Sequence, residues 1–202
     1  MNILLIDDHA LFSKSLEIAL EDYSQIKSFK SIQDISKVIP YIAKNHPDII
    51  LIDINLSNIS SEDGLVLAKS ILATIRTSKI VILTGYDLPV YRYEAKKIGS
   101  KGFINKNILP DKLLQILIDI SNGKEYFSSE VNYIEELTES EKQILQLLCS
   151  GCKRKEIAHM LYSSERTISN HLQHIFDKLN VTSSLEAVTK GIQLGYIKPH
   201  LL

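Results

Sequence analysis

Two adjacent carboxylates stand where an apolar segment near the N-terminus ends. The stretch "LLIDDHALF" (4–12) passes from strand-type residues directly into Asp7 and Asp8. Neighbouring ionised carboxylates repel each other, so we expect a positive charge close to them. Other short apolar runs also end in residues that can do chemistry: Asp53 after "IILI" (49–52), Thr84 after "IVIL" (80–83) and Lys106 after "GFIN" (102–105).

Strand ends of this kind meet at one edge of an open parallel sheet, so these side chains are predicted to converge. Three acids held together need a cation, and oxygen ligands favour Mg²⁺, which takes one or two carboxylates directly. Beside such an ion Asp53 can act as a nucleophile toward a phosphoryl group, with Lys106 neutralising charge on the transferred oxygens. Thr84 would donate a hydrogen bond to the attached group. The alternative, solvated loop acids, accounts for each residue singly but not for the whole set.

The spacing of apolar residues predicts the fold of residues 1–122. Helical patterns, such as the one over 65–75, alternate with the short strand patterns, and a weaker strand candidate lies at 28–32. Strands that alternate with helices indicate βαβ units, and five such strands predict an α/β domain with a doubly wound, five-stranded parallel sheet. Helices on both faces of this sheet would hold the strand ends in place.

From about residue 135 the strand pattern stops and four helical patterns follow. Thr138 and Glu141 have the spacing of a capping box at the start of the first. We therefore predict a small all-α four-helix domain over 135–202, joined to the first domain by a linker over 123–134. The last helical pattern, over 185–197, begins with a second capping-box pair and carries apolar residues that suit either a dimer surface or the core: Ser183 and Glu186, then Val188, Ile192 and Leu194.

Two of these helices have the arrangement of a DNA-reading helix-turn-helix. In "KRKEIAHMLYSSERTISNHLQHIFDKL" (153–179) Ser164 suits the N-cap of the second helix, whose apolar residues recur every three or four positions. Its other face carries short polar and amide groups that can pair with base edges, although most such faces are only solvated. Basic residues at the start of the first helix are expected to meet phosphates. The predicted DNA contacts are Lys153, Arg154, Lys155, Thr167, Ser169, Asn170, His171, Gln173 and His174.

Composition excludes several classes of protein. The chain has 202 residues, 45% of them hydrophobic, and a formal net charge of −1, so DNA binding would have to rest on local clusters of charge. No apolar run approaches the ~20 residues of a membrane helix. The sequence starts directly with a strand pattern, so we expect a cytoplasmic protein without a signal peptide or membrane contact. Cys149 and Cys152 form a C-x-x-C motif without the context of a redox or zinc site, so core packing is expected.

The first domain resembles the response-regulator receiver family over essentially all of residues 1–122. In that family an acid pair, a phosphorylated aspartate, a Ser/Thr and a lysine lie at the ends of strands one, three, four and five. The matching residues here are Asp7, Asp8, Asp53, Thr84 and Lys106. The resemblance implies a flavodoxin-like fold and phosphorylation of Asp53.

The same resemblance assigns further roles. It implies that Thr84 and Phe103, three residues before the lysine, act as a switch, although Phe103 also suits plain core packing. The Mg²⁺ ligands implied by the family are Asp7, Asp8, Asp53 and the backbone carbonyl of Asn55.

One departure from the family pattern follows Asp53. The family usually reads D-x-x-M-P-G-x-x-G, whereas "DINLSNISSEDG" (53–64) lacks the proline and places Gly64 eleven residues after Asp53. The loop is thus three residues longer and more polar. This leaves its conformation open, and with it access for dephosphorylation, but not the acidic group itself.

The second domain resembles the LuxR-type helix-turn-helix over its whole length, through "LTESEKQILQLLCSG…KEIAHML…SERTISNHLQHIFDKLNV…AV". A receiver followed by this domain is similar to the NarL/FixJ class of response regulators. Two departures remove positive charge from the DNA face, since Ser169 and Ser184 stand where the family often has lysine and arginine. We therefore expect weak DNA binding by the monomer and dependence on dimerisation.

Together the resemblances imply a two-component transcription factor. A sensor histidine kinase would phosphorylate Asp53, and a homodimer would then bind promoter DNA, with RNA polymerase as a further partner. The receiver would catalyse only its own phosphorylation and dephosphorylation, so no other enzyme activity is expected. One alternative is a pseudo-receiver controlled by a ligand or partner. The other is a Mg²⁺-dependent aspartyl-phosphate phosphohydrolase, whose D-x-D motif has Asn55 in place of its second aspartate here.

Overall fold

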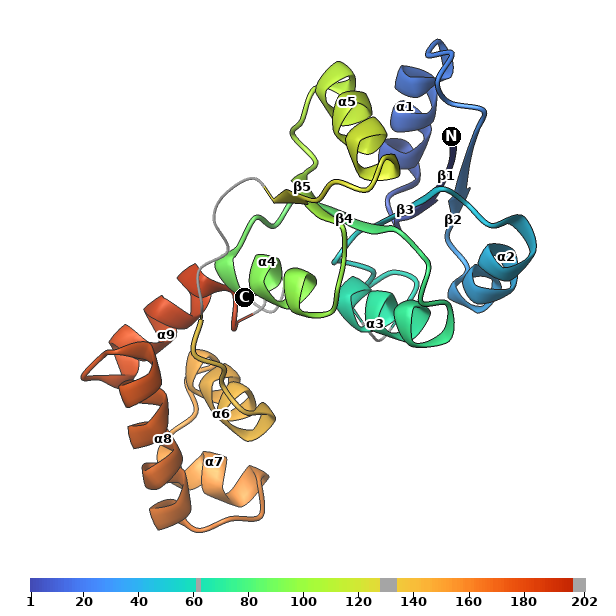
Figure 1. Cartoon of the computed structure of the whole chain (residues 1–202). Coiled ribbons are helices and arrows are strands. Elements are labelled where there is room, and N and C mark those ends of the chain that lie inside the picture. The colour runs from blue at the N-terminus through green and yellow to red at the C-terminus, as the bar shows by residue number, and fades with distance from the viewer. Residues whose placement is uncertain (61–62, 128–133, 198–202) are drawn as a thin grey trace. The chain divides into compact units, whose positions relative to one another are not determined.

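The computed structural model describes residues 1–60, 63–127 and 134–197. The chain divides into two compact units that meet in the sequence near residue 131. Within the described residues, the first unit holds a parallel sheet with helices on both faces, and the second holds helices α6 to α9 (Figure 1). None of the helices in these ranges is long and apolar enough to cross a bilayer.

The sheet of the first unit is built from short strands that are mostly buried. All neighbouring strands are parallel, in the order β2-β1-β3-β4-β5-β6, which places β3 between β1 and β4. The weaker strand candidate at 28–32 is confirmed as β2, an edge strand that alternates exposed and half-buried residues. The strands that the sequence predicts are β1 (Asn2–Ile6), β2 (Ser28–Ile32), β3 (Ile49–Ile52), β4 (Ile80–Thr84) and β5 (Gly102–Asn105).

The sheet also has a sixth strand that the sequence analysis did not predict. β6 (Tyr126–Phe127) pairs in parallel with β5, with Tyr126 opposite Gly102. Glycine suits this position, because an added β-carbon at Gly102 would lie 3.1 Å from the Tyr126 carbonyl oxygen. The strand falls within the predicted linker over 123–134, of which residues 128–133 lie outside the described ranges. The five-stranded prediction is therefore wrong by one strand, since two residues are too short to show a periodicity.

Helices cover both faces of this sheet (Figure 1). α1 (Ala10–Glu21) and α5 (Pro110–Ser121) lie on one face. The other face carries α2 (Val38–Asn45), which follows the short 3₁₀ turn η1 (Ile35–Lys37), together with α3 (Gly64–Thr74) and α4 (Pro89–Lys97). Local signals set the helix starts, because proline opens α5 and the carboxylate of Asp63 accepts the first free N–H groups of α3. The sheet and its flanking helices thus form the predicted doubly wound, flavodoxin-like layer structure.

In the second unit, α6 (Glu139–Cys149), α7 (Arg154–Met160) and α9 (Ser184–Leu194) pack against α8 (Glu165–Leu179). The capping box of α6 is confirmed, since the Glu141 carboxylate accepts the Thr138 N–H at 2.7 Å and the Thr138 hydroxyl accepts the Glu141 N–H at 3.3 Å. Ser164 caps α8 as predicted.

The start and end of α9 differ from the prediction. Ser183 caps the helix, but the Glu186 carboxylate accepts hydrogen bonds from Thr182 rather than closing a box onto Ser183. The helix ends at Leu194, three residues earlier than predicted, because Gly195 adopts φ 97° and turns the chain. Residues 198–202 of the predicted domain lie outside the described ranges.

Several residues that had more than one predicted role pack in the core of the second unit. Val188, Ile192 and Leu194 are half-buried and pack against its buried cluster, which favours the core role over a dimer surface. Cys149 and Cys152 are free thiols that pack against the same cluster, as expected. The carboxylate of Glu141, which is 2% exposed, pairs at 2.7 Å with Lys178 of α8.

Candidate functional site

Backbone hydrogen bonds at the carboxyl edge of the sheet hold the predicted residues together. The N–H of Asp53, just after β3, donates to the carbonyl of Ile6 at the end of β1. The N–H of Lys106, just after β5, donates to the carbonyl of Thr84, the last residue of β4. Strand pairing thus continues past the strand ends and brings side chains from β1, β3, β4 and β5 to one edge.

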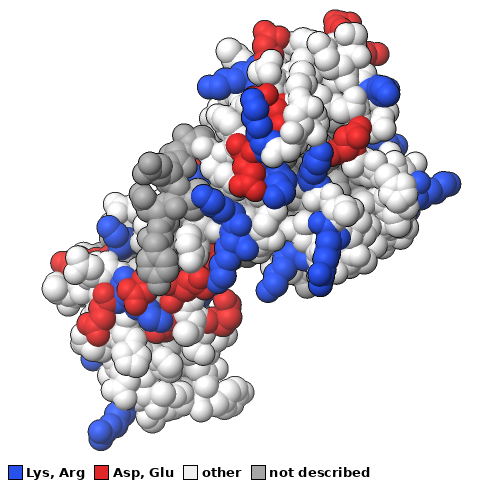
Figure 2. All heavy atoms as spheres, in the orientation of Figure 1, with Lys and Arg blue, Asp and Glu red and all other residues white. Residues whose placement is uncertain are grey.

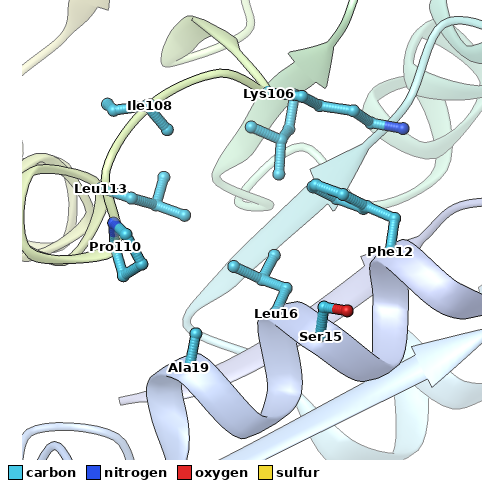
Figure 3. Close-up of a pocket in the computed structure, with 9 residues that line it drawn as sticks. Phe12, Ser15, Leu16, Ala19, Lys106, Ile108, Pro110 and Leu113 are labelled. Carbon is cyan, nitrogen blue, oxygen red and sulfur yellow. The ribbon is translucent and has the colours of Figure 1, made fainter.

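Lys106 supplies positive charge to the first of the two adjacent acids, Asp7, and to Asp53. Its Nζ lies 2.7 Å from Oδ2 of Asp7 and 2.6 Å from Oδ2 of Asp53. Both carboxylates are buried, at 0% and 2% exposure. The ammonium also lies 4.5 Å from the centre of the Phe12 ring on α1, and Figure 3 shows the Lys106 side chain extended over this ring. The lysine therefore reaches the acids along an apolar side chain rather than through water.

The three carboxylates at this edge outnumber the single lysine, so the group keeps a net negative charge. Burial raises the pKa of Asp53 above its ordinary value, and the charge of Asp7 raises it further. The hydrogen bond and charge of Lys106, and the hydroxyl of Thr84, lower this pKa without cancelling the effect of burial. An additional cation would favour the ionised form of Asp53.

The arrangement of the acids fits a divalent cation. Ligand atoms of Asp7, Asp8, His9 and Asp53 all lie within 4.8 Å of one another. Within the described part of the chain, the buried Oδ1 of Asp53 has no hydrogen-bond partner, and Oδ1 of Asp8 faces only the exposed imidazole of His9. Buried carboxylate oxygens left open in this way suit Mg²⁺, which keeps several waters and binds few carboxylates. The sequence analysis missed His9, whose Nδ1 lies 2.8 Å from Oδ1 of Asp8, although its place directly after the acid pair was the available signal.

The other residues assigned to this site lie close to it. Asn55 lines a pocket of about 330 Å³ together with Asp53 and Lys106, on the same side as His9 and Phe12. Thr84 is fully buried, and its hydroxyl accepts the N–H of Tyr86 at 3.2 Å.

Phe103 lies apart from the opening of the site. It is fully buried in β5, opposite Ile82 of β4, so the structure places it in the core of the sheet.

The longer loop after β3 is anchored at both ends. Leu56 is 1% exposed, and its carbonyl accepts the N–H groups of Ile59 and Ser60. At the other end the N–H of Gly64 donates to Ile54, and a β-carbon on Gly64 would lie 1.8 Å from the Asp53 carbonyl oxygen. Only glycine fits there, so the extra residues do not displace the acidic group. Residues 61–62 of this loop lie outside the described ranges.

A second contact that the sequence analysis missed comes from this loop. The backbone N–H and the side-chain Nδ2 of Asn58 both donate to Oδ2 of Asp8, at 3.1 Å and 2.9 Å. These residues are fifty positions apart, and no local pattern indicates such a contact.

The residues predicted to contact DNA lie on α7 and α8 of the second unit. The three basic residues at the start of α7, Lys153, Arg154 and Lys155, are exposed. On α8 the exposed members of the predicted set are Thr167, Asn170, Gln173 and His174, whereas Ser169 and His171 are half-buried. Acidic and basic side chains are interspersed on the face shown in Figure 2.

Hydrogen bonds within α8 occupy some of these polar groups. The hydroxyl of Ser169 donates to the carbonyl of Glu165, and Nε2 of Gln173 donates to the carboxylate of Asp177 at 2.9 Å. The Gln173–Asp177 pair has the four-residue spacing of helix neighbours, a signal that the sequence analysis did not use. In this arrangement Oε1 of Gln173 is the amide atom turned away from the carboxylate.

A buried acid group with one bridging lysine at the carboxyl edge of a doubly wound sheet, followed by a helix-turn-helix unit, defines a response regulator. Comparison with known families agrees: residues 3–118 match the response regulator receiver domain, and residues 135–190 match the bacterial regulatory proteins of the luxR family. The chain belongs to the response regulator family.

Particular relatives extend over nearly the whole chain. It is 29% identical to the nitrate/nitrite response regulator protein homolog of Haemophilus influenzae, covering 93% of this chain and 94% of that protein. RcsB from Salmonella enterica serovar Typhimurium, solved bound to promoter P1flhDC with the phosphomimetic BeF3⁻, has a similar fold, with a TM-score of 0.68 at 22% identity over 96% of this chain and 98% of that one. A structure of two RcsB dimers bound to two parallel DNAs gives the same TM-score at 23% identity and the same coverage.

Proposed function

We propose that this response regulator controls transcription by accepting a phosphoryl group on Asp53 from a sensor histidine kinase and then binding promoter DNA as a homodimer. The observation that carries the proposal is the environment of Asp53. Its carboxylate is buried, Lys106 lies 2.6 Å from one oxygen, and two further acids stand beside it. A buried nucleophile next to a fixed ammonium suits transfer of an anionic group.

In the proposed transfer, a carboxylate oxygen of Asp53 forms a bond to phosphorus as the phosphorus–nitrogen bond of a phosphohistidine breaks. The kinase histidine leaves with the bonding electrons and takes up a proton from water. Lys106 offsets the charge of the phosphoryl oxygens, and the buried hydroxyl of Thr84 donates to one of them once the group is attached. Asp7, Asp8, Asp53 and the backbone carbonyl of Asn55 would hold Mg²⁺, which supplies further positive charge at the same oxygens.

The second unit supplies the output. Its luxR-type helix-turn-helix is the DNA-binding part, and the RcsB complexes with DNA, including the one with dimers, support promoter binding as a dimer. Lys153, Arg154 and Lys155 would meet phosphates while α8 enters the major groove. Acting on promoters places the protein in the cytoplasm, with RNA polymerase as a further partner. Its own phosphorylation and dephosphorylation would be the only reactions it catalyses.

The test joins the two halves of the proposal. Full-length protein is incubated with labelled phosphoramidate and Mg²⁺, and its genomic sites are footprinted with and without beryllofluoride. We expect label on wild type but not on Asp53→Asn, and protection of discrete sites that strengthens with beryllofluoride. Label retained by Asp53→Asn would place the acceptor elsewhere. Site-specific DNA binding without any labelling would instead favour a pseudo-receiver.

A further inference from the structure

We propose that Asn58 is a positioning residue that fixes the carboxylate of Asp8 for a divalent cation. This inference rests on the proposed function, because it concerns the same acidic group. Asn58 is not among the site residues predicted from the sequence, and it lies in the loop between Asp53 and Gly64.

The two carboxylate oxygens of Asp8 have different partners. Oδ2 accepts both hydrogen bonds from Asn58, whereas Oδ1 faces the exposed imidazole of His9. The Asp8 side chain is completely buried, so water does not orient it. Two donors on one oxygen fix the rotation of the carboxylate, which leaves Oδ1 as the oxygen available to a cation held with Asp7 and Asp53.

His9 is the other group at this oxygen. Its Nδ1 lies 2.8 Å from Oδ1 of Asp8, and its side chain is 53% exposed. An exposed imidazole can move into solvent without leaving a buried polar group behind. Asn58 holds the opposite oxygen, so the carboxylate keeps its orientation when Oδ1 changes its partner.

The backbone around Asn58 makes this contact more than a chance loop position. The turn that carries Asn58 is closed by the carbonyl of buried Leu56, which accepts N–H groups from Ile59 at 2.9 Å and Ser60 at 2.8 Å. This turn starts three residues after Asp53. The loop therefore ties the ligand at the end of β1 to the ligand at the end of β3.

An amide is suited to this role because it donates without adding charge. A lysine in its place would neutralise Asp8 and compete with the cation. Mg²⁺ and Mn²⁺ demand well-placed oxygen ligands, and residues that orient a metal's ligands typically contribute about 10–100-fold in metal affinity. Any residue except proline at position 58 keeps the backbone hydrogen bond, so the side-chain amide is the part that a substitution tests.

The experiment measures Mn²⁺ binding to the full-length protein from the electron paramagnetic resonance signal of free Mn²⁺, well below the melting temperature. We expect Asn58→Ala and Asn58→Leu to raise the Mn²⁺ dissociation constant about tenfold. Leucine has the same branched arrangement of side-chain heavy atoms as asparagine but no donors, so an effect of alanine alone would assign the loss to packing and overturn the proposal. Ser57→Ala, an exposed neighbour on the same turn, is the matched control and should change the constant less than about twofold.

Two further outcomes separate this inference from the function on which it rests. Wild type and Asp53→Asn binding Mn²⁺ equally well would overturn the proposed acidic site, and the role of Asn58 with it. Binding that depends on Asp53 but is unchanged in both Asn58 variants would overturn the role of Asn58 alone. Circular dichroism melts of all the variants in EDTA check that a change in affinity does not reflect unfolding.

Discussion

Lys106 carries positive charge to two buried carboxylates at once, and this does not balance the group. Three acids converge at the edge, the pKa of Asp53 remains raised, and Oδ1 of Asp53 has no hydrogen-bond partner among the described residues. At the scale of single residues, repulsion between the buried carboxylates therefore destabilises the folded protein, and a bound cation or a covalent modification can reduce this repulsion. Stability is the simplest property in which this charge should appear.

We predict that Asp53→Asn stabilises the protein in the absence of divalent metal. The neutral amide removes a charge that burial disfavours, so the melting midpoint at pH 7 should rise by roughly 2–4 °C, equivalent to about 1 kcal/mol. A raised pKa means that the folded state binds the proton more tightly than the unfolded state. The stability of wild type should thus fall, relative to the variant, as pH rises from the ordinary value of 3.8 through the folded pKa.

Melts in EDTA across this pH range test that prediction, with Glu21→Gln, an exposed acid of α1, as the control for losing one negative charge. Mg²⁺ should then raise the midpoint of wild type and have little effect on Asp53→Asn. A variant less stable than wild type at pH 7 in EDTA would show that the carboxylate is not under electrostatic strain.

At the scale of elements, the packing of α6 on α8 includes the buried ion pair between Glu141 and Lys178. The capping-box spacing indicated the role of Glu141 at the helix start but not this pairing. Burial alone would raise the pKa of Glu141, but hydrogen bonds from Lys178 and Thr138, with the lysine charge, outweigh it and lower the pKa. Glu141→Gln keeps the size of the side chain and removes the charge. We expect a loss of about 1–3 kcal/mol at pH 7, since Lys178 remains partly exposed to solvent.

The pKa of Glu141 is lowered, whereas that of Asp53 is raised, so the two carboxylates should make stability depend on pH in opposite directions. The stability contributed by ionised Glu141 is complete above its ordinary value of 4.5 and disappears as pH falls through the folded pKa, so the variant should approach wild type in acid. Urea titrations read by hydrogen exchange in α6 and α8 would measure this. The side chain of Glu139 is 90% exposed and pairs with Lys142, so the control variant Glu139→Gln should lower the free energy of unfolding by less than about 0.5 kcal/mol. Equal losses in both variants would exclude a special role for the buried pair.

Residues of α7 and α8 that are predicted to contact phosphates should respond to substitution differently from those predicted to contact base edges. If the amide groups of Asn170 and Gln173 meet base edges as we predict, Asn170→Ala or Gln173→Ala should cost about 1–3 kcal/mol on the preferred operator and much less on a scrambled duplex. Lys153→Ala should weaken both duplexes alike and lower the salt slope by about one. Titrations at several salt concentrations measure both effects. If the Asn170 and Gln173 variants lose affinity equally on both duplexes, specificity resides in DNA shape or dimer spacing.

Sequence reasoning succeeded where position follows from the backbone of a regular element. Asp53, Thr84 and Lys106 could be placed because strand ends in a parallel sheet must meet at one edge. β6 could not, because two residues carry no period. Asn58 could not either, because its contact with Asp8 joins residues fifty positions apart and no local pattern indicates it.

In the whole molecule, the two units should communicate through Thr84. Thr84→Ala keeps the buried position and removes the hydroxyl that we assign to the phosphoryl group. We predict that phosphoramidate still labels this variant, while beryllofluoride no longer raises its affinity for operator DNA. Labelling is measured together with operator titrations of the full chain, and Ser57→Ala serves as a control loop variant. A full rise in DNA affinity in Thr84→Ala would remove Thr84 from the switch.

The loop between Leu56 and Gly64 is also a place where this fold can vary in length without loss of its site. Its ends are fixed independently, by a leucine in the core and by a glycine against the Asp53 carbonyl. Lengthening a segment between fixed ends adds little closure entropy, because that cost grows only with the logarithm of length. Residues between these fixed ends can therefore be exchanged or added without displacing the acidic group, and a donor such as Asn58 among them can adjust how the group holds a cation.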